Sequence, residues 1–332
     1  PGFADRHVES GRECIDDAQR QCLLCQSILP QAPARGKSPR PPREAYRALR
    51  GHAQPAYNGS GCPERGRERV ANGIVTLCTD FGLRDGYVAA MKGAMLAVAP
   101  GLTLVDISHE VGPQAIAEGA FVLSTAYDAF PAGTVHLAVV DPGVGSARRA
   151  LAVRTPRHTL VAPDNGVLTH VLRREGVVAA VALAEPAYWR RPVSATFHGR
   201  DVFAPVAAHL ALGVPLEALG PPAEDLVTLD WPAPERRGAL LLGHVAHVDR
   251  FGNVISDVPA ALLGDARVAE VEVGALRVGS AGGLLRTYAE APRGGALALI
   301  GSHGHLEVAV REASAAAASG ARIGDEVRVR LA

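Results

Sequence analysis

From residue 73 onward, apolar strand-like runs alternate with segments of helical spacing, and this alternation limits the possible folds more than any other feature. The run "GIVTLCTD" (73–80) is typical of a buried strand, and "GYVAAMKGAMLAVAP" (86–100) has helical spacing and stops at a proline. Strands joined through helices become parallel neighbours, with the helices on both faces of the sheet. We therefore predict an α/β fold whose N-terminal domain contains a mainly parallel sheet.

The same pattern continues to about residue 213. Asp164 is expected to cap the helix that follows it, because aspartate is a favoured N-cap residue. The remaining strands are expected within 102–108, 134–141, 150–155, 158–166 and 177–184, and the remaining helices within 113–130, 166–175 and the second half of 196–213.

After this region the sequence changes character. A stretch rich in proline and charge, "PPAEDLVTLDWPAPERRG", is followed by short strand-like runs separated by glycine-rich turns. This pattern predicts a smaller, barrel-like β domain at the C-terminus. The expected organisation is a disordered extension over 1–72, the α/β catalytic domain over 73–225, a linker over 226–235 and the β domain over 236–332.

The first 72 residues are rich in Pro, Gly and Arg and show no sustained hydrophobic period, which is typical of disorder. They contain Cys14, Cys22, Cys25 and Cys62, which could be four zinc ligands or simply reduced thiols.

The formal net charge of the whole chain is zero, and no apolar run approaches the roughly 20 residues that cross a bilayer. We expect a soluble, cytoplasmic protein with neither a nucleic acid nor a membrane as its partner.

Two predicted strands are each followed by an aspartate, Asp80 after "GIVTLCT" and Asp141 after "TVHLAVV". In open α/β sheets, ligands bind beyond the carboxyl ends of the strands. One such aspartate is usually a turn former, whereas two make a ligand site a better explanation. An aspartate in this position can accept both hydroxyls of a ribose.

The loop "VVDPGVGSARRA" (139–150) resembles a phosphate-binding loop, but Arg148 stands where a dinucleotide fingerprint requires its third glycine. A strand rather than a helix follows, so no helix N-terminus faces a phosphate. The glycines are better explained as a tight turn that returns Arg148 to Asp141 and holds this carboxyl ionised. A structural turn with a surface ion pair is the alternative.

The stretch "FHGRD" (197–201) places His198 at the start of a predicted helix. A metal could be held by His198, Asp201 and Asp141, or by His303 and His305. No HExxH or comparable ligand spacing supports either set, so we expect no metal.

Six motifs occur in order along residues 73–332: "TDFGLRDGYVAAMKG", "VVDPGVGSARR", "APDNG", "TFHGRDVFAPVAAHLA", "DRFGNVISD" and "GSHGHLEVAVREASAA". Together they resemble the S-adenosylmethionine hydroxide adenosyltransferase family, the water-using branch of a superfamily that includes the fluorinase and the chlorinase. The resemblance implies that water attacks the 5′ carbon of S-adenosyl-L-methionine and releases adenosine and L-methionine. This hydrolysis requires no cofactor.

The resemblance also implies roles for individual residues. It makes Asp141, Arg148 and His198 the catalytic set, and Asp80 the ribose-binding acid. It places Phe251 and Asn253 beside the nucleoside, Asp249, Ser302 and His303 near the methionine end, and Glu307 and Val310 at the adenine. Two positions depart from the fluorinase, because His303 replaces an arginine and Gln114 replaces a tryptophan.

The family further implies a homotrimer or a dimer of trimers, with sites between neighbouring subunits. Three other functions stay open at this point. A non-catalytic nucleoside sensor would need Asp80 and Asn253 but not the catalytic set. A methyltransferase would need a glycine-rich loop after the first strand, of which "TDFGLRDG" is a poor version. A halide-using adenosyltransferase would carry an uncharged aromatic residue in place of Asp141.

Overall fold

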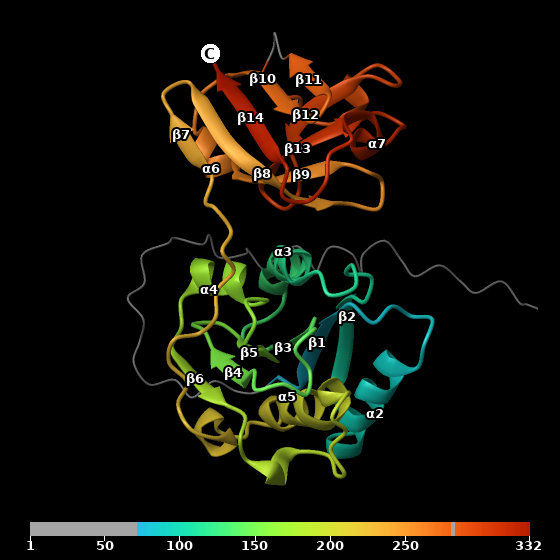
Figure 1. Ribbon diagram of the computed structural model, residues 1–332, viewed down its shortest axis with the longest axis vertical. Helices are drawn as coiled ribbons and strands as arrows, with labels where there is room; N and C mark the ends of the chain where they lie inside the picture. The colour runs from blue at the N-terminus through green and yellow to red at the C-terminus, as the bar shows by residue number, and fades with distance from the viewer. Residues whose placement is uncertain (1–71, 280–282) are drawn as a thin grey trace, which may run out of the picture. The chain divides into compact units, whose positions relative to one another are not determined.

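The computed structural model describes residues 72–279 and 283–332 (Figure 1). The predicted disordered extension and the four cysteines considered as zinc ligands lie outside these residues. Within them, the predicted α/β fold with a mainly parallel sheet and a smaller barrel-like β domain is confirmed.

The sheet of the α/β domain has six strands in the order β2-β1-β3-β5-β4-β6. Neighbours from β2 to β5 are parallel, whereas β4 is antiparallel to both β5 and β6. The loop between β4 and β5 spans only residues 155–158, too short for the crossover that a parallel pair needs. The strands are β1 (Ile74–Thr79), β2 (Thr103–Ser108), β3 (Val135–Val139), β4 (Ala150–Arg154), β5 (Thr159–Pro163) and β6 (Ala179–Ala182).

Helices cover both faces of this sheet. Figure 1 shows α2 (Tyr87–Val98) and α5 (Ala204–Ala211) on one face, and α3 (Ile116–Ala126) and α4 (Thr169–Glu175) on the other. Two clusters of buried apolar residues fill these layers, one under α2 and α5 and one under α3 and α4. The central strands β1 and β3 are buried on both sides, which explains why they are nearly continuous apolar runs in the sequence.

The strand order places a topological switch point between β1 and β3. From β1 the chain continues to β2 on one side, while β3 pairs with β1 on the other side. The connections leave in opposite directions there, so a ligand crevice is expected at the carboxyl ends of β1 and β3, where doubly wound proteins bind ligands. Asp80 directly follows β1 and Asp141 lies two residues beyond β3, so both aspartates lie at this crevice.

The β domain is an antiparallel sheet of eight strands. Its main path runs β11-β10-β14-β8-β9-β13-β12, and the two ends of this path approach each other to form a nearly closed barrel. Strand β14 shows the expected alternation, with every second residue buried. The strands are β7 (Glu235–Arg237), β8 (Leu240–Val248), β9 (Val254–Pro259), β10 (Val268–Val273), β11 (Leu276–Gly279), β12 (Ala296–Ile300), β13 (His305–Val310) and β14 (Glu326–Leu331), with short helices α6 (Ala260–Leu263) and α7 (Ala315–Ser319).

The prediction that Asp164 caps α4 is wrong. Leu168 is the N-cap residue and no side chain caps this helix. Asp164 lies too far upstream because a turn intervenes. Its carboxylate instead accepts hydrogen bonds from Arg149 Nε (2.7 Å) and from the backbone N–H of Val227 (2.8 Å).

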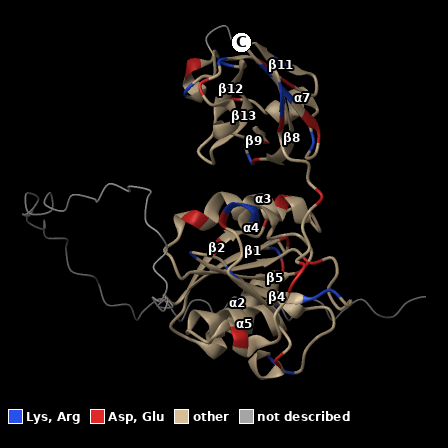
Figure 2. Ribbon diagram, turned by 90° about the vertical axis from the view of Figure 1, so that its left-hand side faces the viewer, with Lys and Arg blue, Asp and Glu red and all other residues tan. Residues whose placement is uncertain are grey.

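The segment after residue 225 is hydrogen-bonded to its surroundings rather than free. The backbone N–H of Leu229 donates to Thr169 Oγ1 (2.9 Å), and the indole N–H of Trp231 donates to Asp257 Oδ2 (2.8 Å). Within the described residues, no helix is long and apolar enough to cross a membrane. In the view of Figure 2, basic and acidic residues are interspersed over both domains.

Candidate active site

Asp141 and Arg148 form a buried ion pair at the carboxyl end of β3. Their side chains are 5% and 11% exposed, so this is not the surface ion pair of the alternative interpretation. Arg148 Nε donates to both carboxylate oxygens of Asp141, at 2.9 and 3.0 Å, and its Nη2 donates to Oδ2. The guanidinium also lies over the ring of Phe203, 5.2 Å from the ring centroid. Arg148 therefore has one fixed position.

Two glycines make this loop possible. A Cβ at Gly143 would lie 3.2 Å from Cγ of Arg148, in the path by which the arginine folds back. Gly145 has φ = +78°, a conformation that strains residues with a Cβ. A Cβ there would also lie 2.5 Å from the carbonyl oxygen of Ala195. The Asp141–Arg148 loop thus packs closely against the segment that leads to His198.

His198 completes the cluster through Arg148, whose Nη2 lies 3.0 Å from Nδ1 of the imidazole. A guanidinium in proteins always carries its protons and can only donate, so Nδ1 must be the acceptor. His198 is therefore neutral and carries its proton on Nε2. Burial, and next the charge of Arg148, lower the pKa of His198 from its ordinary value, although Asp141 and Asp201 oppose this. The tautomer and the lowered pKa both indicate a neutral imidazole.

A π-helical turn, Gly199–Phe203, follows His198 and leads into α5. Such turns are rare and are often found at functional sites. Asp201 lies in this turn, is fully buried, and accepts hydrogen bonds from Arg190, Arg200 and the backbone of Ser194. The sequence indicated that His198 starts a helix but did not reveal the role of Asp201 in its packing.

Asp80 lies across the switch point from Asp141. Its Oδ2 accepts a hydrogen bond from the backbone N–H of Gln114 (2.8 Å), which has φ = +65°. The preceding Thr79 pairs through Oγ1 with Nδ1 of His109 (2.8 Å). This network fixes the end of β1 and leaves Asp80 Oδ1 available to a ligand hydroxyl.

The β domain contains two further groups of predicted site residues. In the first, Asp249 organises the turn between β8 and β9. Its carboxylate accepts from the backbone N–H groups of Phe251 (2.9 Å) and Asn253 (2.8 Å) and from the amide of Asn253 (2.9 Å). Asn253 is buried, whereas Phe251 is 79% exposed. Asp249 therefore shapes the turn that displays Phe251.

The second group surrounds the buried carboxylate of Glu307 on β13. Tyr288 donates to Oε1 (2.6 Å), and His303 Nε2 lies 3.2 Å from Oε2. The backbone N–H of His305 points at Nδ1 of His303, so the proton of His303 resides on Nε2 and is donated to Glu307. Burial and the neighbouring Glu307 raise the pKa of Tyr288. Sequence reasoning missed Tyr288, because no motif connects it to Glu307.

Ser302 and Val310 flank this second group. Ser302 is exposed in the turn before β13, and Val310 is buried at the end of that strand. Gly301 has no room for a side chain, since a Cβ would lie 2.4 Å from His303 Nε2. Among the described residues, no hydrogen bond or ion pair joins the Asp141 cluster to either group of the β domain. No set of three or more His, Cys, Asp or Glu residues suited to a metal is found there either.

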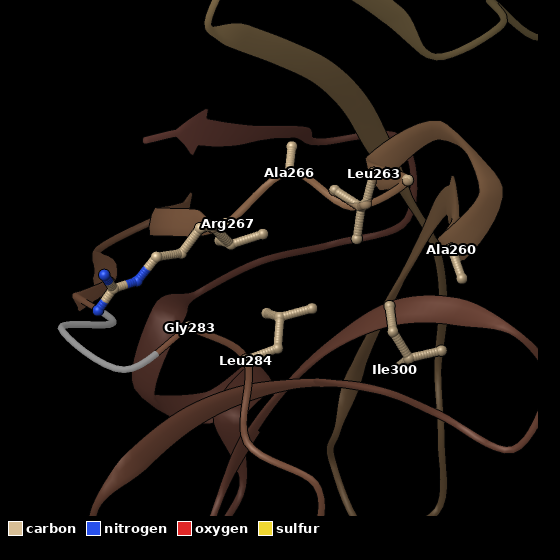
Figure 3. A pocket seen from close by; sticks show the side chains of 9 residues that line it. Ala260, Leu263, Ala266, Arg267, Gly283, Leu284 and Ile300 are labelled. Carbon is tan, nitrogen blue, oxygen red and sulfur yellow. The ribbon is translucent and has the colours of Figure 1, made fainter.

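A cavity of about 200 Å³ lies within the β domain beside α6 (Figure 3). In the figure, the aliphatic side chains of Leu263, Leu284 and Ile300 surround it, and the guanidinium of Arg267 extends away from them. It contains no predicted site residue, and its apolar walls offer few groups to recognise a charged nucleoside. The crevice of the α/β domain is the better candidate.

Comparisons with known proteins bear on the family of the chain. Residues 75–220 match the SAM hydroxide adenosyltransferase N-terminal domain, and residues 243–328 match the C-terminal domain of the same family. A protein named (R)-S-adenosyl-L-methionine hydrolase from Thermus thermophilus is 44% identical over 265 residues, covering 77% of this chain and 98% of the relative. A protein of the same name from Salinispora arenicola is 43% identical, covering 77% of this chain and 97% of the relative.

More distant relatives and solved structures complete the comparison. A fluorinase from Nocardia brasiliensis is 30% identical, covering 78% of this chain and 97% of the relative. The crystal structure of an uncharacterized conserved protein from Thermotoga maritima superposes with a TM-score of 0.73 at 36% identity, covering 77% of this chain and 99% of the other. On these matches to both domains, the chain belongs to the SAM hydroxide adenosyltransferase family.

Proposed function

We propose that this protein hydrolyses S-adenosyl-L-methionine to adenosine and L-methionine. The observation that carries the proposal is the partly buried Asp141–Arg148–His198 cluster at the switch point, opposite Asp80. A nucleoside sensor would need only the binding residues and would have no use for a carboxylate and a neutral imidazole fixed on one arginine. The names of two relatives at 44% and 43% identity point to the same reaction.

In this reaction the water oxygen forms a bond to the 5′ carbon while the bond between that carbon and sulfur breaks. The sulfur takes the electron pair and leaves as the neutral thioether of methionine, so the leaving group needs no acid. One proton is released from the water. Water has a pKa of about 15.7, so the protein must supply a proton acceptor and fix the direction of attack.

The geometry supports a different part for each of the three residues. Asp141 is the only anion of the cluster, so it accepts the proton of the attacking water. His198 has its Nδ1 occupied by Arg148 and carries a proton on Nε2, so it donates a hydrogen bond and orients the water. Arg148 holds both groups in place. Asp80 accepts the ribose hydroxyls, as the resemblance implies.

The relatives are named for the (R) epimer at sulfur, which adds a stereochemical expectation that the sequence did not suggest. We extend this preference to the present chain. The two epimers share the reacting carbon and differ in where the methyl group points. A pocket that positions the adenosine and methionine parts together can therefore reject one of them by contact with the methyl group.

Incubation with a mixture of the two epimers tests this proposal by chromatography. We expect adenosine and methionine to form in equal amounts while the (R) peak falls first. Formation of S-adenosylhomocysteine would identify a methyltransferase, and a lack of product despite binding would identify a sensor. Equal consumption of the two epimers would overturn the stereochemical part alone.

We further propose that the active enzyme is a homotrimer or a dimer of trimers in which the β-domain groups of one subunit complete the crevice of a neighbour. The exposed Phe251 supports this, because a large aromatic residue that is 79% exposed is available to cover a ligand. Light scattering at the assay concentration should give a mass of three or six chains. A fully active monomer would contradict the proposal.

A further inference from the structure

The buried carboxylate of Asp201 joins the segment before His198 to the turn that follows His198. It belongs to the π-helical turn that follows His198 and is fully buried. Oδ1 accepts from Arg190 Nη1 (3.1 Å) and Arg200 Nε (2.7 Å), and Oδ2 accepts from Arg200 Nη2 (2.8 Å) and from the backbone N–H of Ser194 (2.9 Å). All four contacts are to residues 190–200.

These contacts tie the segment before His198 to the turn after it. The backbone N–H of Arg190 donates to the carbonyl of Asp201 (2.8 Å), which adds a main-chain connection to those of the carboxylate. Residues 194–196 are thereby held at a fixed distance from His198. A hydrogen bond from a backbone N–H to a buried charged group is among the stronger kinds in proteins.

The held segment is the one on which the Asp141–Arg148 loop rests. The carbonyl oxygen of Ala195 lies directly against Gly145, where it leaves no space for a Cβ. The position of residues 194–196 therefore sets how closely the Arg148 loop approaches the His198 turn. The 3.0 Å contact between Arg148 and His198 depends on this approach.

We propose that Asp201 is a positioning residue that keeps the His198 turn in register with the Asp141–Arg148 loop. It does not touch the reacting atoms and acts through His198. The inference rests on the proposed hydrolase function for its kinetic readout, but its structural readout does not depend on that function.

The test is the substitution Asp201→Asn, which keeps the size of the side chain and removes the charge that holds both arginines. We expect kcat to fall about 10- to 100-fold with KM changed less than about two-fold, since a misplacement of the order of 1 Å can cost about 10²-fold in rate. In 15N NMR spectra of the imidazole, His198 should change from the pure Nε2–H tautomer to a mixture.

Asp257→Asn is the matched control. The side chain of Asp257 on β9 is 8% exposed, its carboxylate accepts from the indole N–H of Trp231 (2.8 Å) and from the backbone N–H of His244 (2.8 Å), and none of these contacts is to a segment of the cluster. This variant should lose comparable thermal stability while kcat and the His198 spectrum stay unchanged. If both variants lower kcat equally, or if Asp201→Asn lowers only the stability, Asp201 is a structural ion-pair partner and the proposal is overturned.

If the Asp201→Asn protein does not fold, Arg190→Met is the second variant. It removes one of the two arginine partners of Asp201 while Arg200 remains, and the side chain of Arg190 is 47% exposed. Its control is Arg154→Met, whose side chain is 34% exposed and pairs with Glu217. We expect a smaller loss of kcat in Arg190→Met only. If the wild-type protein hydrolyses no S-adenosylmethionine, the proposed function fails, but an altered His198 tautomer in Asp201→Asn would still support positioning, and an unaltered one would refute it.

Discussion

At the scale of single residues, we propose that the pairing of Asp141 with Arg148 decides how water is activated. The carboxylate is buried and is the only anion of the cluster. Asp141→Asn keeps the shape of the side chain but removes the proton acceptor, so turnover should fall roughly 10²- to 10⁴-fold, the usual scale for loss of a general base. Adenosine should still bind, as isothermal titration can check. If turnover survives, water is activated elsewhere.

The same residue should determine which nucleophile is accepted. A chloride or fluoride ion 4 Å from the Asp141 carboxylate would be repelled by about 4 kcal/mol at an effective dielectric near 20. Arg148 offsets this only in part, because its N–H groups already point at the carboxylate and at His198. Adenosine should therefore remain the product in concentrated chloride or fluoride. A 5′-halogenated nucleoside that forms faster than adenosine would place the chain with the halide-using enzymes.

His198 predicts the pH dependence of turnover. Burial and the Arg148 charge lower the pKa of His198 from its ordinary value of 6.5. The neutral form is the one that accepts from Arg148, so activity needs His198 unprotonated. Turnover should stay constant from pH 8 down to about 6.5 and fall only at lower pH, where protonation places two cations side by side. Initial rates across this range are the measurement. An acidic limb with its midpoint above pH 7 would contradict the assignment.

At the scale of elements, the active site depends on the close contact between two loops. Gly145→Ala puts a Cβ 2.5 Å from the Ala195 carbonyl and strains a backbone with φ = +78°, so the Arg148 loop must move. We expect kcat to fall at least about 10-fold. Gly176→Ala is the control. Gly176, at the end of α4, has a similar φ of +76°, but a Cβ added there would meet no neighbouring atom within 4 Å. It should lower the free energy of unfolding by about 1 kcal/mol and leave kcat unchanged.

The elements themselves were largely predictable from periodicity, because β1 and β3 are buried on both faces and α2 has a clear helical spacing. Asp80 and Asp141 could be found because each follows an apolar run. The capping role expected of Asp164 was wrong, since its partners Arg149 and Val227 are 15 and 63 residues away. Local sequence signals cannot reveal such distant partners, and the same limit concealed the contact of Tyr288 with Glu307.

The π-helical turn after His198 was unpredictable for a different reason. Its sequence "GRDVF" is compatible with an ordinary α-helix. The wider turn follows from tertiary contacts, namely the hydrogen bonds of Asp201 to the 190–194 segment and the packing of Gly199 between Met91, Phe197 and Phe81. The roles of the β-domain residues came from the family resemblance alone, since a turn such as 249–253 carries no chemical signature of its own.

At the scale of the whole molecule, buried histidines should make the fold sensitive to mild acid. Burial lowers the pKa of His136 to about 3, and burial is also the main cause of the lowered pKa values of His170, His198, His209 and His305. In the unfolded chain these groups bind protons near pH 6.5. Below that pH the unfolded state binds more protons than the folded state, so the free energy of unfolding must decrease as the pH falls.

Each fully suppressed histidine contributes at most about 1.4 kcal/mol per pH unit between pH 6.5 and its folded pKa. The window from pH 6.5 to 5 isolates this effect, because carboxylates titrate near pH 4. Urea unfolding at pH 8, 6.5 and 5 should show a small decrease in the free energy of unfolding between the first two values and a larger decrease at the third. The variant Thr76→Val with His136→Leu replaces the buried pair joined by a 2.7 Å hydrogen bond and should reduce the slope by about one proton. If the double substitution leaves the pH slope of the free energy of unfolding unchanged, His136 is protonated in the folded protein. Burial of His136 would then not be a cause of the acid sensitivity.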